Sequence, residues 1–271
     1  MGKSSVYEKW RSSNHKHLEI CRDKRLLVTF SGGKDSTVCL EFLHRSQEPY
    51  GFDIEAHIYP YPVHRYSTAF KETIQEYWGE RGVKLVYHET RQDDTCLESS
   101  GDPCRLCQEI RKKILFSLFS QLEAPLSSLV IVSGHSLWDL AGYALEVFIE
   151  RELSGEGKHV RTEGADRFRE IAQRFYPYLV LPEGYSVFRP MLCLNQDEIE
   201  AVVKAGDIPV LGVPCRYSPL RPKKILGVYF ARFGHKFSYE RVMNFAKKYL
   251  SVADIHEFKP AAKEEYLSRH F

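Results

Sequence analysis

The sequence predicts an α/β fold in which a parallel sheet is flanked by helices. Short apolar runs typical of buried strands alternate along the chain with longer segments whose apolar residues recur at helical spacing. A glycine-rich turn joins the first strand to the next helix, an order typical of βαβ units. Sites in such sheets lie at the carboxyl ends of the strands. The chain has 271 residues, which is enough to bury one large core.

The predicted elements follow in order along the chain. The strand-like runs cover residues 26–30, 52–59, 83–87 and 129–133. Helices are expected near residues 37–45, 67–82, 108–121 and 136–153. No apolar run approaches the ~20 residues that a membrane helix needs, so no membrane partner is expected.

The turn after the first strand reads Ser31-Gly32-Gly33-Lys34-Asp35-Ser36. Its glycine pair lets the backbone turn tightly and present bare N–H groups, and the helix N-terminus behind it adds partial positive charge. Lys34 adds a mobile cation, and the two serines add hydroxyl donors. The turn is therefore an anion cradle, although it lacks the Gly-x-x-x-x-Gly-Lys-[Ser/Thr] pattern of the Walker P-loop.

Ser-Gly-Gly-Lys-Asp-Ser after a hydrophobic strand resembles the PP-loop of the N-type ATP pyrophosphatase superfamily. The resemblance implies a PP-loop/HUP-like, Rossmann-type fold and an ATP whose β,γ-pyrophosphate lies in the turn. It also implies transfer of AMP to a substrate oxygen rather than transfer of a γ-phosphoryl group. The motif is specific for the superfamily and much less specific for the reaction.

The cysteines number seven, an odd count, and the first residues do not read as a signal peptide. Both observations argue against a disulfide framework and predict a reducing, cytoplasmic location. Cys39 and Cys193 lie in apolar runs and are expected in the core. Cys21 and Cys96 have no assigned role.

Cys104 and Cys107 end a polar loop and open a helix. Their thiols are expected to point the same way and to have pKa values lowered by the helix dipole. One Cys-x-x-Cys pair fits a redox pair or half a zinc site. Cys215, far along the chain, is a third candidate ligand. Three thiolates suit a cubane iron–sulfur cluster with one open iron, whereas a structural zinc would want a fourth ligand.

Four motifs in order extend the resemblance to the iron–sulfur-dependent tRNA thiolation enzymes, the 2-thiocytidine and 2-thiouridine synthetases. The matches, within roughly residues 25–226, are Pro103 to Arg111, Gly134-His135 with Asp139, Arg189-Pro190-Met191, and Pro214-Cys215. Trp138 departs from the pattern, because the family usually has Gly-His-x-x-Asp-Asp. The zinc-finger cysteine pairs that flank the 2-thiouridine branch are also absent from this sequence.

This resemblance implies ATP, Mg²⁺ and a 4Fe–4S cluster as cofactors. Adenylation would turn a pyrimidine carbonyl oxygen into a leaving group, which sulfur then replaces. The expected cluster ligands are Cys104, Cys107 and Cys215, and the expected catalytic residues are Lys34, Arg111 and Asp139. Nucleotide contacts are expected from Thr29, Phe30, Ser31, Gly32, Gly33, Lys34, Asp35, Ser36, Ile58, Gly134 and His135. Helix capping by Asp139 and a surface role for Arg111 are the competing interpretations.

Three parts are expected along the chain. Residues 1–24 form a helical lead-in, residues 25–215 form the PP-loop ATPase domain with the cluster site, and residues 216–271 form a helical C-terminal arm. Compared with the thiolation family, residues 154–175 look like an insertion, either a lid or an idle surface helix.

The C-terminal arm is rich in basic and aromatic residues. The net charge of the whole chain is only +2, yet residues 216–248 contain nine lysines and arginines against the single acid Glu240. Such a segment suits phosphates and unpaired bases, so tRNA is the expected partner. Charge reversal at Lys223 and Lys224 is expected to reduce RNA affinity without changing ATP binding. The competing interpretation is a solvated basic face with a packed aromatic stripe.

Other functions stay open from the sequence. A small-molecule sulfur transferase or desulfidase, resembling the enzymes of the nickel-pincer cofactor, shares the PP-loop and a cysteine-rich site. A PP-loop reductase of adenylylsulfate type is weakened because no catalytic cysteine motif lies near the C-terminus. A non-enzymatic nucleotide-binding module would leave the three placed cysteines unexplained. The sulfur donor is expected to be sulfide or a sulfur carrier, and a homodimer is left open.

Overall fold

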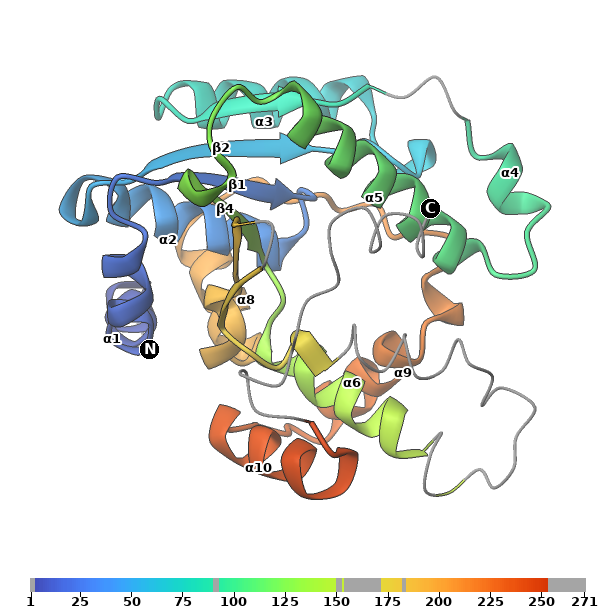
Figure 1. The fold of residues 1–271 in the computed structure, drawn as a ribbon. Helices are drawn as coiled ribbons and strands as arrows, with labels where there is room; N and C mark the ends of the chain where they lie inside the picture. The colour runs from blue at the N-terminus through green and yellow to red at the C-terminus, as the bar shows by residue number, and fades with distance from the viewer. Residues whose placement is uncertain (1–2, 90–92, 150–152, 154–171, 182–183, 253–271) are drawn as a thin grey trace.

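The computed structural model describes residues 3–89, 93–149, 153, 172–181 and 184–252, whose arrangement is shown in Figure 1. Within them, six strands form one sheet in the order β3-β2-β1-β4-β6-β5. Neighbouring strands are parallel except β5, which pairs antiparallel with β6 at one edge. The strands are β1 (Arg25–Phe30), β2 (Asp53–Ile58), β3 (Lys84–Tyr87), β4 (Leu129–Ser133), β5 (Tyr178–Val180) and β6 (Ser186–Phe188).

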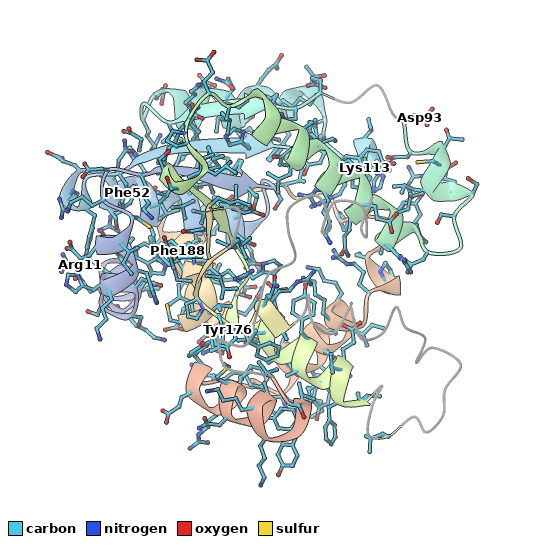
Figure 2. All side chains as sticks on the ribbon, in the orientation of Figure 1. Arg11, Phe52, Asp93, Lys113, Tyr176 and Phe188 are labelled. Carbon is cyan, nitrogen blue, oxygen red and sulfur yellow. The ribbon has the colours of Figure 1, made fainter. Side chains whose placement is uncertain are left out.

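Helices cover both faces of the sheet because its central strands are apolar on both sides. In β1, Leu26 and Val28 point to one face and Leu27 to the other, as the alternation of a strand requires. The first face is covered by α1 (Lys3–Ile20), α2 (Lys34–Tyr50), α3 (Thr68–Gly79) and α8 (Gln196–Gly206). The second is covered by α5 (Pro103–Gln121), which the short α4 (Thr95–Glu98) precedes. Phe188, labelled in Figure 2, is fully buried in the first core.

A second apolar cluster holds the C-terminal helices beside the sheet. It is built by α6 (Leu137–Phe148), α9 (Pro222–Arg232) and α10 (Tyr239–Leu250), which lie together in Figure 1. Phe230 of α9 is buried, and its ring centroid lies 5.7 Å from that of Trp138 and 4.7 Å from that of Phe237. Because α6 directly follows β4, this packing brings α9 to the carboxyl end of the sheet.

The predicted α/β fold is confirmed, and the four predicted strands are β1 to β4. The sheet is parallel as predicted except at one edge, where β5 runs antiparallel to β6. Strands β5 and β6 and helix α8 were not predicted. Of the predicted helix 136–153, α6 forms Leu137–Phe148, and Ile149 and Leu153 are π-helical. Of the predicted insertion 154–175, only residues 172–175 are described, and the arm beyond residue 252 also lies outside the described residues.

The cysteines of the described residues form no disulfide, and two of them lie in or against the core. All seven cysteines are free thiols. Cys39 is buried in the first core, and Cys193 packs against it, as predicted. Among the described helices, none has the length and apolar character needed to span a membrane.

Acidification from about pH 6.5 to pH 5 is expected to destabilise the fold. His57 on β2 is buried against His88, with 2.9 Å between its Nδ1 and Nε2 of His88. Burial and the neighbouring His88 lower the pKa of His57 to about 4. In this window the unfolded state therefore binds more protons, and His57 contributes about 2 kcal/mol of destabilisation at pH 5.

Denaturant titrations at several pH values measure this dependence. His57→Asn should flatten it between pH 6.5 and 4, whereas the same change at the exposed His235 should leave it unaltered. Equal slopes in all three proteins would contradict the assignment to His57.

Candidate active site

Two polar turns meet at the centre of the sheet, at the carboxyl ends of β1 and β4. The strand order runs β3-β2-β1 on one side of this point and continues from β4 on the other. Consecutive connections therefore leave in opposite directions there, and ligands of open α/β sheets bind at such a switch point. Residues 31–36 follow β1, and residues 134–136 follow β4.

The first turn is held by its two serine side chains. The Oγ atoms of Ser31 and Ser36 lie 3.1 Å apart. Ser36 Oγ accepts the N–H of Ser31 at 3.2 Å and donates to the carbonyl of Gly33 at 2.9 Å. Gly32 has a φ of +70°, a left-handed conformation that glycine tolerates best. These contacts fix the turn in front of α2, whose N-terminus attracts anions.

Gly134 lets the second turn approach the first. A Cβ at this position would lie 3.0 Å from Cα of Ser36 and 3.1 Å from its backbone nitrogen. The next residue, His135, has its Nδ1 2.5 Å from Oγ of Ser133. Burial lowers the pKa of His135 to about 3, so its imidazole is neutral at physiological pH. The Gly134 backbone thus lies against the start of α2, and the neutral ring of His135 lies near Ser133 and Tyr143.

Asp139 has both a capping bond and a charged partner. One carboxylate oxygen accepts the backbone N–H of Ser136 at 3.1 Å, at the N-terminus of α6. The other accepts Nζ of Lys223 at 2.7 Å. Burial alone would raise the pKa of Asp139, but the charge of Lys223 and these hydrogen bonds hold it well below its ordinary value. The capping interpretation is confirmed, and the ion pair with α9 adds a contact that the sequence analysis missed.

Lys34 and Asp35 form the polar start of α2. Lys34 Nζ donates to Oδ1 of Asp35 at 2.6 Å and to Oε1 of Gln196 at 2.8 Å. Burial raises the pKa of Asp35 against the opposing charge of Lys34, and the charge of Asp139 adds to the rise. The two carboxylates therefore lie close enough to influence each other.

A pocket of about 440 Å³ opens beside these residues. Four lysines and several acids from α2, α6, α8, α9 and the loop after α9 line it, among them Lys34, Asp35, Asp139, Lys223, Lys224 and Lys236. Burial and the charge of Lys223 lower the pKa of Lys224. The four lysines of the pocket face four acids, and the pocket adjoins the N-terminus of α2, which attracts anions such as phosphate groups.

Lys223 and Lys224, which the sequence assigned to RNA contact, line this pocket. Charge reversal at Lys223 would place an acid against Asp139, and Lys224 is influenced by the charges of both Lys34 and Asp35. Reversal of either lysine would therefore also change the charge around the glycine-rich turn, and its effect on ATP binding stays a prediction. Sequence position alone could not separate the pocket face of α9 from its outer face.

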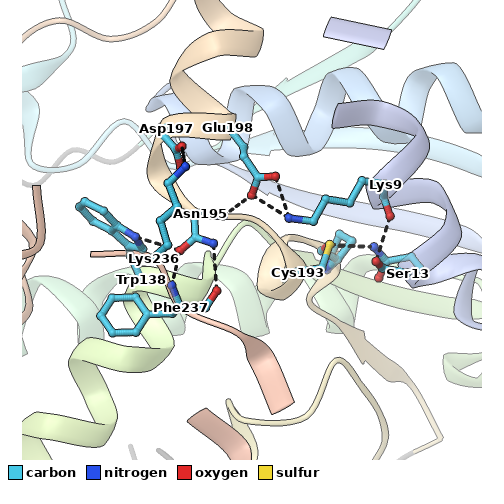
Figure 3. A network of polar contacts seen from close by, with 11 residues as sticks. Lys9, Ser13, Trp138, Cys193, Asn195, Asp197, Glu198, Lys236 and Phe237 are labelled. Carbon is cyan, nitrogen blue, oxygen red and sulfur yellow. Dashed lines mark hydrogen bonds and ion pairs between the residues drawn. The ribbon is translucent and has the colours of Figure 1, made fainter. Parts of the chain in front are cut away.

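Trp138, the departure from the family pattern, joins three helices. Its Nε1 donates to Oδ1 of Asn195, the residue preceding α8, at 3.2 Å. The same oxygen accepts the backbone N–H of Phe237 at 2.8 Å, and Asn195 Nδ2 donates to the carbonyl of Phe237 at 3.0 Å (Figure 3). Lys236 also pairs with Asp197 at 2.8 Å. This network, which the sequence analysis missed, ties α6 and the α9–α10 connection to α8 at the wall of the pocket.

The three candidate cluster ligands share one neighbourhood. Cys104 and Cys107 lie in the first two turns of α5, and Sγ of Cys104 lies 3.6 Å from the carbonyl oxygen of Tyr217, two residues after Cys215. Burial raises the pKa of both α5 thiols, and the charge of Cys215 adds to the rise. The prediction that the helix dipole lowers these pKa values is therefore wrong, because burial outweighs it.

The cysteine neighbourhood has the donor chemistry of an iron–sulfur site but not its final geometry. The charge of Arg221 works to lower the pKa of both α5 thiols, against the effect of burial. The charge of Arg111, one turn beyond Cys107, works to lower the pKa of that thiol and of Tyr59. Across the described residues, no three His, Cys, Asp or Glu side chains are grouped closely enough to hold a metal ion as they stand. Three thiols with two guanidinium groups beside them fit the chemistry of a cluster whose net charge is negative.

The remaining predicted nucleotide contacts divide into two groups. Lys34 and Asp35 line the pocket. Phe30 and Ile58 are buried in the first core, and Thr29 donates its hydroxyl to the carbonyl of Val132 at 2.9 Å. These last three residues are placed as parts of the sheet rather than as parts of the pocket wall.

The fold is an α/β fold with a glycine-rich turn after β1, and it can now be compared with known proteins. No family model matches the chain. A tRNA-cytidine(32) 2-sulfurtransferase of Enterobacter sp. (strain 638) is 24% identical over 253 residues, covering 87% of this chain and 72% of that protein. A tRNA(Ile)-lysidine synthase of Thermosipho africanus (strain TCF52B) is 23% identical over 205 residues, covering 76% of this chain. The predicted resemblance to the PP-loop superfamily is thereby confirmed.

The chain spans only part of the length of some of these relatives. It covers 42% of the Thermosipho enzyme and 53% of a tRNA-cytidine(32) 2-sulfurtransferase of Paraburkholderia phytofirmans. Among solved structures, the U34-tRNA thiolase NcsA from Methanococcus maripaludis with its [4Fe-4S] cluster has a TM-score of 0.67 at 17% identity. That match covers 96% of this chain and 80% of the thiolase, and it establishes the likeness of fold.

Proposed function

We propose that this protein is an ATP-dependent tRNA sulfurtransferase, which adenylates a pyrimidine carbonyl oxygen and replaces that oxygen with sulfur. One observation carries the proposal: the segment from Cys215 to Lys224 joins two sites of complementary chemistry. Near its start lies the cysteine pair of α5, on which the charge of Arg221 acts. At its end, Lys223 and Lys224 line the pocket beside the glycine-rich turn. Activation of the base and delivery of sulfur would take place at neighbouring sites.

In the activation step, ATP would bind with its β,γ-pyrophosphate on residues 31–36, where the α2 N-terminus and Lys34 supply positive charge. The substrate oxygen attacks the α-phosphorus, and pyrophosphate leaves with the electron pair of the broken P–O bond. Asp35 and Asp139, which are close enough for one charge to raise the other's pKa, are our candidates for Mg²⁺ ligands. Lys223 holds Asp139 ionised for that role.

In the sulfur-transfer step, Cys104, Cys107 and Cys215 would hold a 4Fe–4S cluster, and Arg111 would stabilise their thiolate charge. When bound, the cluster supplies an iron with an open coordination position for hydrosulfide. Sulfide or a sulfur carrier is the proposed donor. The C–S bond forms at the activated carbon, and AMP leaves with the electron pair of the C–O bond. A closed site favours this outcome because water would otherwise hydrolyse the adenylate.

The outer face of α9 supports tRNA as the substrate. Phe230 is buried, but Tyr229 and Phe233 are 51% and 61% exposed, with ring centroids 4.8 Å apart. Arg232 is exposed on the same helix. Each of the two interpretations of the arm therefore holds for part of it. Phe230 belongs to a packed aromatic stripe, whereas the rings of Tyr229 and Phe233 are available for stacking on unpaired bases.

Loss of Arg232 is expected to weaken tRNA binding through lost phosphate contact. Arg232→Ala should flatten the salt dependence of tRNA affinity by about one unit of slope, while ATP affinity stays unchanged because Arg232 does not line the pocket. Filter binding over a range of salt concentrations measures the slope. Lys16→Ala is the matched control, since Lys16 is exposed on α1, away from α9 in Figure 1. An equal change in the two variants would contradict the assignment to α9.

Nucleoside mass spectrometry of tRNA from a deletion strain tests the proposed function. A thiolated pyrimidine present in the parent strain should be absent from the deletion strain and should return with the intact gene but not with a Cys107→Ser copy. Unchanged tRNA nucleosides would favour the small-molecule sulfur transferase instead.

A further inference from the structure

The segment that carries Cys215 is held by the connection between β2 and α3. Arg65 Nε donates to the carbonyl of Val213 at 3.3 Å. The backbone N–H of Arg216 donates to Nε2 of His64 at 3.2 Å. Cys215 therefore lies between two attachment points, both supplied by residues next to each other in the short 3₁₀ helix Val63–Arg65.

His64 is itself oriented by Asp94, which follows β3 and precedes α4. Its Nδ1 lies 2.6 Å from Oδ2 of Asp94, and the same carboxylate accepts the backbone N–H groups of Val63 and His64 at 2.8 and 3.0 Å. The side chains of His64 and Asp94 are only 13% and 12% exposed. Because Nδ1 donates to the carboxylate, Nε2 carries a lone pair and can accept the N–H of Arg216. Asp94 thus fixes the tautomer that the second bond requires.

The other contacts of the segment reach α4 and α5. Sγ of Cys104 lies 3.6 Å from the carbonyl of Tyr217, and the Tyr217 ring meets that of His64 edge-on, with centroids 6.0 Å apart. Arg216 pairs with Glu98 at 2.8 Å, but both side chains are more than half exposed, so this pair contributes little. The backbone bond from Arg216 to His64 is the contact that holds the segment here, and the part-buried Asp94–His64 contact orients the ring that accepts it.

We propose that His64, oriented by Asp94, is a positioning residue for Cys215, keeping its thiol within reach of the cysteine pair of α5. The inference rests on the proposed function, in which Cys215 is a cluster ligand. Partners that orient the ligands of a metal site are often worth about 10-fold or more in metal affinity. His64 would act in this way through the backbone of the adjacent residue rather than through the sulfur itself.

Two variants of His64 separate its two hydrogen bonds. His64→Asn keeps an amide where Nδ1 lies, within reach of Asp94, but removes the acceptor for Arg216. His64→Gln places an amide oxygen near the position of Nε2 and so retains an acceptor for Arg216. After anaerobic reconstitution, His64→Asn should lose iron to a chelator about 10-fold faster than the unaltered protein, and His64→Gln should stay near it. In iron-free protein, mass spectrometry should find Cys215 alkylated faster relative to Cys104 in His64→Asn only.

The outcomes distinguish this inference from the proposed function. Unchanged iron retention and alkylation in His64→Asn would overturn the positioning role, as would a lowered melting temperature with iron retention intact. If His64→Asn does not fold, Asp94→Asn, which leaves His64 in place but weakens its orientation, should show the same two changes to a smaller extent, and their absence would overturn the role. A Cys215→Ser protein that keeps its full iron content would instead overturn the ligand assignment of the proposed function.

Discussion

Exchange of Cys107 for serine should remove most of the iron that the unaltered protein binds, which we expect to be about four atoms per chain after anaerobic reconstitution. Serine has nearly the shape of cysteine, but its hydroxyl does not supply a thiolate ligand. We choose Cys107 because the charges of both other candidate ligands, Cys104 and Cys215, raise the pKa of its thiol. Iron and sulfide analysis, together with the visible absorption of the cluster, measure the loss.

Cys96 provides the matched control for this exchange. It is another free thiol near the same helices, and its Sγ lies 3.2 Å from the hydroxyl of Tyr61, a contact that serine can still make. Cys96→Ser should therefore keep its iron and its tRNA thiolation. Colourless protein with one stoichiometric zinc, or equal iron in the Cys96 and Cys107 variants, would show that the cluster assignment is wrong.

Gly134→Ala should lower nucleotide turnover by about 100-fold while leaving the cysteine site able to bind iron. The added Cβ would lie 3.0 Å from the Cα of Ser36, and since this neighbour is backbone it cannot swing aside. The glycine-rich turn or the start of α6 must shift, and a displacement of that kind at the phosphate cradle misplaces the α-phosphorus. Release of pyrophosphate from ATP in the presence of tRNA measures the effect.

Gly79→Ala is the control for the loss of a glycine, because a Cβ at Gly79 would meet no atom within 4 Å beyond its chain neighbours and the backbone of its own helix. This variant should turn over ATP at the rate of the unaltered protein. If Gly134→Ala also does so, the close approach of the two turns has no part in nucleotide binding.

The sequence was sufficient to predict the sheet and its anion cradle. The central strands β1 and β4 are mostly apolar, as strands covered on both faces must be, and the motif at residues 31–36 follows β1. Strands β5 and β6 were missed because each has three residues, too few for a periodic pattern. Helix α8 has a regular amphipathic pattern, and Asn195 with Glu198 forms a capping box at its N-terminus, so its sequence carried a recognisable start signal.

The site was harder to predict because its contacts join distant parts of the chain. Asp139 was selected from the family motif, but its partner Lys223 comes from the arm that the sequence assigned to RNA. Nothing in the local sequence separates a lysine that faces the pocket from one that faces solvent on the same helix. The direction of the pKa shift of Cys104 and Cys107 could not be predicted from the local sequence either. The effect of the helix dipole can be inferred from their position at the start of a helix, but burial, which raises their pKa, depends on the tertiary fold.

The central claim is that one chain couples adenylation of a tRNA base to its thiolation. The direct measurement uses reconstituted protein, tRNA from the deletion strain, ATP, Mg²⁺ and sulfide under anaerobic conditions, with AMP and thiolated nucleoside quantified in the same samples. We expect AMP and thiolated nucleoside to appear in equal amounts. With the Cys107→Ser protein, no thiolated nucleoside should form, and AMP should appear only through hydrolysis of the adenylated tRNA. Formation of ADP and phosphate, or of AMP without any thiolated nucleoside in the iron-loaded protein, would contradict the central claim.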